Sequence, residues 1–323
     1  MDFLKNIDFG ELFGKINDLI GKINWGDLSD KAKPALGKVV DFLKKSPGIL
    51  VALTLFLTVL SDPVAGNTGS ARLTQEEVRT LIDASFMNKG LTNDGKYYYT
   101  SGAISFAKYT ALAKYEIDSV KRVKYKVFPV NWELIKKGYD NIGGLSYYNG
   151  KIYAAMESKS GRTAPCIAVF DAESLSYETS YELPASWFPQ GITWVAVDKD
   201  TGILYTCAWP AADTIHSFRV DATMAHVKEI DVSGSATLDR ICGGEVYQGE
   251  LYLSQDMESS RIDNVVRVAL ENGESDVFFS RDCGRSDGVA GDITVYQKRD
   301  GSMFHVCDYN GIIGVYLRSY SVI

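Results

Sequence analysis

The chain has 323 residues, of which 46% are apolar and 23% charged, and its formal net charge is −7 with a pI near 5.2. This composition is that of a globular protein and not of a disordered one, and the length accommodates one large all-β domain with an N-terminal appendage. The acidic balance argues against nucleic-acid binding, because proteins of that class usually present a basic face to the phosphates.

The first 47 residues are predicted to form amphipathic helices. Apolar residues recur at spacings of three and four from Phe3 to Ile23, and a second such stretch runs from Ala35 to Leu43. Such a periodicity indicates helices with one apolar face. We expect residues 1–47 to lie on the cytoplasmic membrane surface or to pair with a partner helix.

A hydrophobic segment follows at residues 48–66. Its uncharged core from Ile49 to Leu60 would span about 18 Å as a helix, which is shorter than the roughly 30 Å hydrocarbon core of a bilayer. Three interpretations stay open: a buried helix of a soluble domain, a signal peptide cleaved near Val64-Ala65-Gly66, and an uncleaved signal-anchor that serves as a transmembrane helix.

The charges beside this segment predict its orientation. Lys44 and Lys45 precede it and Asp62 follows it, so the N-terminus is expected in the cytoplasm and the rest of the chain outside. The predicted location is therefore the cell membrane, with a single span and an extracellular main domain, or secretion. Residues 67–88 read as a linker and a possible ring-closing strand, and residues 89–323 as the main domain.

An internal repeat runs through that main domain. Each copy has a strand, a tight turn and a second strand that ends in a recurrent position, occupied by Tyr99, Tyr153, Tyr205, Tyr252 and His305. A third apolar strand follows each copy, and more polar segments such as 177–183 leave room for a fourth. Turns such as Asn149-Gly150 supply the positive φ that a two-residue hairpin needs.

Repeats of about 50 residues with three or four antiparallel strands are typical of β-propeller blades. The count predicts five blades, with six as the alternative. The last copy ends at Ile323 without room for a fourth strand, so residues 74–88 are expected to supply it, although their start also fits a helix cap.

The repeat motif resembles that of known bacterial extracytoplasmic propellers. The pattern Gly144-Leu145-Ser146-Tyr147 followed by Asn149-Gly150-Lys151-Ile152-Tyr153, and then by an apolar strand that ends in Phe170-Asp171, is similar to glutaminyl-cyclase-like, NHL-like and lactonase-like propellers. The resemblance covers residues 90–320 and implies the fold. It implies an activity only weakly, because those groups share the motif.

Two columns of variable polar residues are expected to converge on one end of the propeller axis. They lie where the innermost strands start and where the second strands end, and such variable groups on a rigid scaffold are where function is usually placed. One hypothesis is a non-catalytic site for a small molecule, glycan or protein, lined by Asn141, Gln190, Trp209, Arg240 and Tyr309. The alternative is a Ca²⁺-dependent lactonase or esterase, or a glutaminyl-cyclase-like enzyme, with Glu157, Asp256, Asp292 and Asp308 as metal ligands. A third interpretation is that these carboxylates only accept hydrogen bonds from neighbouring backbone N–H groups.

Other chemistry finds little support in the sequence. With only three histidines, a His-rich metal site is not expected, and His216 and His305 are predicted to be core or edge residues. The five cysteines show no C-x-x-C pair. Cys242 and Cys283 are the one pair expected to be near enough for a disulfide.

Overall fold

The computed structural model describes residues 73–81, 87–104, 109–158, 164–258, 260, 262–282, 288–310 and 314–322. The predicted amphipathic helices at 1–47 and the hydrophobic segment at 48–66 lie outside these residues. Within the described part of the chain, no helix is both long enough and apolar enough to span a membrane.

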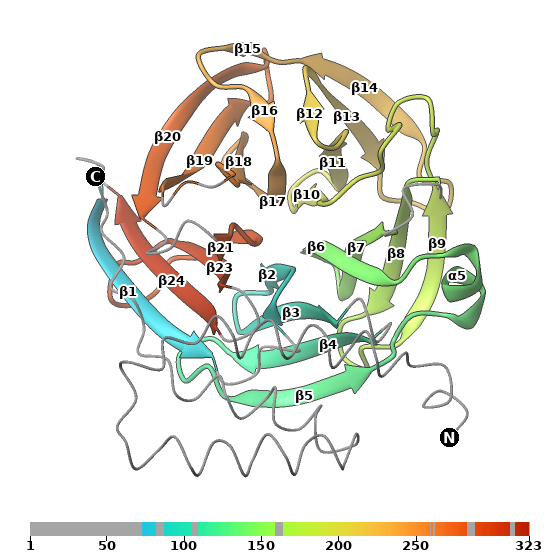
Figure 1. Ribbon diagram of the computed structural model, residues 1–323, viewed down its shortest axis with the longest axis horizontal. Coiled ribbons are helices and arrows are strands. Elements are labelled where there is room, and N and C mark those ends of the chain that lie inside the picture. Colours follow the sequence, from blue (N-terminus) through green and yellow to red (C-terminus); the bar gives the residue numbers. More distant parts are fainter. Residues whose placement is uncertain are drawn as a thin grey trace, which may run out of the picture.

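Five antiparallel sheets stand around a central axis, so the chain is a five-bladed β-propeller (Figure 1). Blade 1 contains β2 (Leu91–Asn93), β3 (Tyr97–Ile104), β4 (Tyr109–Glu116) and β5 (Arg122–Val127). Blade 2 contains β6 (Asn141–Tyr148), β7 (Lys151–Glu157), β8 (Cys166–Asp171) and β9 (Tyr177–Glu182). Blade 3 contains β10 (Ala196–Asp198), β11 (Ile203–Cys207), β13 (Thr214–Arg219) and β14 (His226–Asp231).

Blade 4 contains β17 (Ile241–Tyr247), β18 (Glu250–Gln255), β19 (Ile262–Ala269) and β20 (Glu274–Asp282). Blade 5 contains β22 (Ile293–Val295), β23 (Phe304–Asn310), β24 (Gly314–Val322) and β1 (Leu73–Leu81). Short strands join this frame: β12 (Ala211–Ala212) pairs with β16 (Leu238–Asp239), β15 (Ser233–Gly234) with β20, and β21 (Gly288–Val289) with β23. A helix that the sequence did not predict, α5 (Trp132–Lys137), connects blades 1 and 2.

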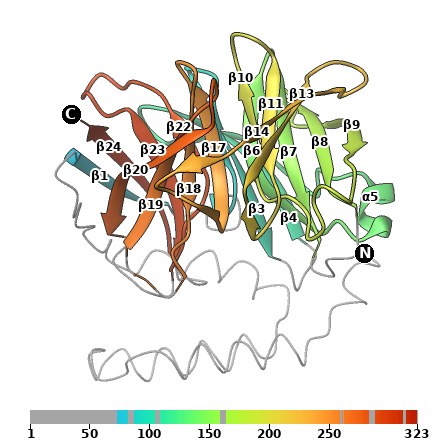
Figure 2. The ribbon, with the colours of Figure 1, turned by 90° about the horizontal axis from the view of Figure 1, so that it is seen from above.

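The ring closes through its N-terminal strand, as the sequence predicted. β1 pairs antiparallel with β24 from Leu73 opposite Val322 to Leu81 opposite Val315 (Figure 2). The outermost strand of blade 5 therefore comes from the opposite end of the chain from the other three. This arrangement covers the edge of β24, which would otherwise present unpaired backbone groups.

Local sequence explains the hairpins inside the blades. Asn149 and Gly150 have φ of 48° and 78°, and Gln248 and Gly249 have φ of 52° and 79°, the two successive positive values of a type I′ turn. These turns connect the first and second strands of blades 2 and 4. The recurrent Tyr position is buried in all five blades, and His305 occupies it in blade 5 with no exposed surface.

The hydrophobic core is divided among the seams between blades. Five clusters of buried residues each join two adjacent blades: Tyr99 and Leu112 pack with Ile142, for example, and Tyr252 packs with Phe304. Each blade buries both of its faces in this way, which a single blade cannot do alone.

The inner strand of blade 3, β10, has only three residues and begins at Ala196. Thr193 instead bonds neighbouring blades: its carbonyl accepts from the N–H of Gly144, and its hydroxyl donates to the carbonyl of Ile241. Through these two bonds, Thr193 connects blade 3 to blades 2 and 4.

Candidate functional site

Asp292 lies fully buried at the centre of the ring, directly before β22. Its Oδ2 accepts from the N–H groups of Leu91 at 2.9 Å and Leu145 at 2.7 Å. Its Oδ1 accepts from those of Gly244 at 3.0 Å and Ile293 at 2.9 Å. Burial raises the pKa of this carboxyl well above its ordinary value, while the backbone donors act in the opposite direction. Because the donors belong to the inner strands of four blades, Asp292 ties those blades together.

A second buried network crosses the ring through Glu245. Its Oε1 forms an ion pair with Lys199 Nζ at 2.8 Å, and its Oε2 accepts from the Thr294 hydroxyl at 3.1 Å. Asn93 in turn donates from Nδ2 to Thr294 Oγ1 at 2.6 Å. Burial raises the pKa of Glu245, and Lys199 opposes this rise. The four side chains come from four different blades, so this network also connects the ring.

Polar groups that reach solvent gather at the end of the axis where the inner strands start. Glu157 at the end of β7 accepts from Asn141 Nδ2 at 2.5 Å, and its Oε2 lies 3.7 Å from Lys89 Nζ. The side chains of Lys89 and Glu157 are 37% and 22% exposed. The Glu157 carboxylate raises the pKa of Lys89, which keeps the ammonium charged at neutral pH.

A second ion pair lies at the same end of blade 4. Arg240 donates from Nη2 and Nε to Asp256 Oδ2, at 2.5 and 3.2 Å, and its Nη1 lies 3.5 Å from the exposed Glu258. The guanidinium also lies over the Trp209 ring, 5.5 Å from its centroid. Arg240 has a φ of 51°, and its backbone is held by bonds to Pro210 and Asp256.

Cys242 lies within electrostatic range of both ion pairs. Burial raises the pKa of its thiol, Asp256 and Glu157 raise it further, and Lys89 lowers it. The thiol is therefore protonated at neutral pH and is a poor nucleophile. Cys242 is a free cysteine in the structure, and its predicted neighbour Cys283 lies outside the described residues, so their proximity stays a prediction. We call this group the start-face cluster: Lys89, Asn141, Glu157, Trp209, Arg240, Cys242 and Asp256.

The remaining predicted residues are placed differently. Asp308 is buried, and its Oδ2 contacts Arg281 Nη1 at 2.5 Å and Arg318 Nε at 2.9 Å. Gln190 is exposed in the segment between β9 and β10. Tyr309 lies on β23, but its side chain lies outside the described part of the chain.

The four carboxylates predicted as calcium ligands are not assembled into one site. Asp292 accepts from backbone N–H groups, and Glu157, Asp256 and Asp308 each pair with basic side chains of the protein itself. Among the described residues, the one group of three metal-ligating side chains whose ligand atoms lie together is His216, His226 and Glu229. The sequence reasoning missed this group because it regarded the histidines separately.

His305 is a core residue, as predicted. Its Nδ1 lies 2.8 Å from Ser319 Oγ and its Nε2 lies 2.7 Å from the carbonyl oxygen of Tyr296, while its ring meets Tyr98 edge-on. His216 is also buried, but it belongs to the group just described.

No family model matches the chain, and no curated protein matches it. Among solved structures, it is similar to a β-xylosidase at 12% identity, with a TM-score of 0.53 over 76% of this chain and 98% of that one. It is also similar to a luciferin-regenerating enzyme at 9% identity, with a TM-score of 0.47 over 76% of this chain and 95% of that one. The likeness to the β-xylosidase concerns the fold alone. The resemblance to glutaminyl-cyclase-like, NHL-like or lactonase-like groups stays a prediction.

Proposed function

We propose that the propeller is a non-catalytic binding module that acts outside the cytoplasm and holds a glycan or a peptide segment at the start-face cluster. The observation that carries this proposal is the pairing of Lys89 with Glu157 and of Arg240 with Asp256 at one end of the axis, next to Trp209. The cluster thus offers fixed donors and acceptors beside a partly exposed aromatic ring.

The balance of charge supports a neutral or zwitterionic ligand. Two cations stand beside three carboxylates, counting the exposed Glu258, so a ligand with a large net charge of either sign would meet like charges here. Sugars and peptide groups, in contrast, use donors and acceptors together. An aromatic ring with a polar neighbour supplies the apolar contact that such ligands also need.

The alternative of a Ca²⁺-dependent hydrolase has less support. Its four carboxylates would each have to exchange a protein partner for the ion, and two of them, Asp292 and Asp308, are almost completely buried. The thiol of Cys242 is protonated and so does not offer a nucleophile in place of a metal-bound water. A location outside the cytoplasm is proposed from the hydrophobic segment at 48–66 and the charges that flank it.

The test is a glycan and peptide array probed with the full chain, followed by titration calorimetry on the ligands retained. We expect Trp209→Ala to weaken binding about tenfold or more, because aromatic anchors dominate many binding sites. Trp132→Ala is the matched control, since Trp132 is 64% exposed on α5 and belongs to another part of the surface. Equal loss in both variants, or none in Trp209→Ala, would refute the start-face cluster as the site.

A melt with EDTA and then with Ca²⁺ separates the two functions. The binding module is expected to melt at the same temperature in both conditions. A rise of several degrees with Ca²⁺, abolished by Asp256→Asn, would instead favour the hydrolase.

A further inference from the structure

A bulge in the outer strand of blade 3 brings three ligating side chains to one face. His216 on β13 pairs in register with Glu229 on β14, and Phe218 pairs with His226, with an irregularity between Ser217 and Phe218. In a regular strand, residues three apart such as His226 and Glu229 would point to opposite faces. The extra residue of the bulge returns them to the same face, a role that bulges often have near functional sites.

Aromatic rings fix the position of His216. The indole of Trp187, from the segment between β9 and β10, stacks on the His216 imidazole with 4.9 Å between centroids and 4° between planes. Phe188 meets the same imidazole edge-on at 4.9 Å, and Trp187 also contacts the ring of His226 at 4.6 Å. One histidine is therefore held rigidly in the seam between blades 2 and 3, next to a second one at the surface.

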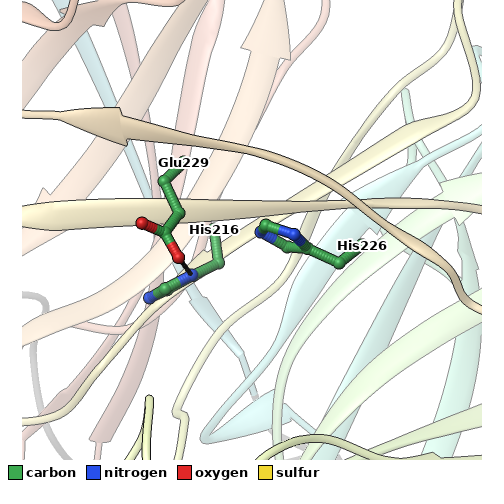
Figure 3. A group of neighbouring side chains, drawn as sticks. All are labelled: His216, His226 and Glu229. Atoms are coloured by element: carbon green, nitrogen blue, oxygen red, sulfur yellow. Dashed lines mark ion pairs between the residues drawn. The ribbon is translucent and has the colours of Figure 1, made fainter.

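The polar atoms of the three side chains face one another (Figure 3). His216 Nδ1 is buried, makes no hydrogen bond, and lies 3.6 Å from Glu229 Oε1. One ligand atom from each of the three residues lies within 4.8 Å of the other two. A buried nitrogen without a hydrogen bond carries a desolvation cost unless another group satisfies it.

We propose that His216, His226 and Glu229 form a binding site for a zinc ion, separate from the start-face cluster. Two imidazole nitrogens and one carboxylate oxygen are ligands that Zn²⁺ accepts, whereas Ca²⁺ prefers oxygen alone. With three protein ligands, a tetrahedral ion keeps its fourth position for water or for an oxygen of another molecule. The site would also join β13 to β14, the outermost strand of blade 3.

The geometry requires only a small adjustment. Zn–N and Zn–O bonds of about 2.1 Å place two ligand atoms of a tetrahedral ion about 3.4 Å apart. The 3.6 Å between His216 Nδ1 and Glu229 Oε1 is close to this value. His226 and Glu229 are exposed, so their side chains can turn toward the ion while His216 stays in place.

The experiment is equilibrium dialysis and calorimetry of the full chain with Zn²⁺ alone, and absorption spectroscopy with Co²⁺ in its place. We compare the unaltered protein with His226→Gln and Glu229→Gln, whose exposed positions leave the fold intact. Asp231→Asn is the matched control, because Asp231 is an exposed carboxylate on the same strand but outside the group. His216→Gln is a third variant, accompanied by a melt because its ring is packed in the seam.

We expect His226→Gln and Glu229→Gln each to weaken Zn²⁺ binding about tenfold or more, and Asp231→Asn to leave it unchanged. The Co²⁺ complex of the unaltered protein should show the intense visible absorption of four-coordinate cobalt, and both ligand variants should lose it. The proposal is overturned if the unaltered protein does not bind Zn²⁺, or if both ligand variants bind it as tightly as the control does.

Discussion

Replacing Asp292 by Asn tests whether this carboxylate holds the ring together. Asn keeps the shape of the side chain, but only its oxygen accepts, so its NH₂ group would face two of the four backbone N–H donors. The backbone N–H donors favour the carboxylate form of Asp292 and oppose the effect of burial on its pKa. Two hydrogen bonds to this charged acceptor are lost, at about 1.5–3 kcal/mol each, which predicts a destabilisation of about 3–6 kcal/mol. That is a large part of the roughly 5–15 kcal/mol by which a domain is stable.

The assay is urea and thermal unfolding of the full chain, followed by tryptophan fluorescence, to which the completely buried Trp194 contributes. For a domain of this size, a loss of about 4 kcal/mol lowers Tm by on the order of 10 °C. Asp213→Asn is the control, because Asp213 is exposed and its side chain accepts a hydrogen bond from its neighbour Thr214. If Asp292→Asn unfolds like the control, the four N–H groups do not depend on a charged acceptor and Asp292 does not hold the ring together.

Three further perturbations test the frame in thermal and urea melts. Gly291→Ala should lower the free energy of unfolding by several kcal/mol, because its Cβ would lie 1.7 Å from the carbonyl oxygen of Cys307. Gly150→Ala is the control: its Cβ meets no atom within 4 Å, and it should cost only about 1 kcal/mol for its positive φ. Equal losses in the two variants would argue against the close approach at Gly291. Lys199→Met should lower the stability of the fold more at pH 8 than at pH 5. The variant leaves the buried Glu245 carboxylate without its cation, and because the pKa of Glu245 is raised in the folded state, that carboxylate becomes neutral as the pH falls. A loss of stability that does not depend on pH would contradict the pairing. Deleting residues 1–82 should lower Tm and promote aggregation compared with deleting residues 1–70. Only the longer deletion removes β1 and so exposes the edge of β24. Identical melts of the two shortened proteins would show that β1 does not close the ring.

Much of the fold was predictable because the signals that specify it are local. Each hairpin depends on a turn such as Asn149-Gly150, and each blade on alternating apolar strands that lie next to each other in sequence. The missing fourth strand of the last copy also predicted the closing role of β1 correctly. The helix α5 was missed because a stretch of six residues is too short for a clear periodicity.

The candidate site was predictable only as a set of polar residues before and after strands. Asn141 pairs with Glu157 across β6 and β7, and Arg240 lies over the Trp209 ring. Their partners were not predictable, because the pairs with Lys89 and Asp256 depend on rotamers and on how neighbouring blades meet.

The sequence alone establishes the repeat and favours five blades with a closing strand from residues 74–88, because these follow from patterns within about 50 residues. The tertiary structure decided what the variable polar residues do. From the sequence alone, Asp292 was a candidate calcium ligand. In the structure it accepts hydrogen bonds from the backbone of Leu91 and Leu145, which lie 201 and 147 positions away and so could not be paired with it from local patterns. His216, His226 and Glu229 come together only because of one bulge in β14, and a single inserted residue in a ladder has no signature in composition or periodicity.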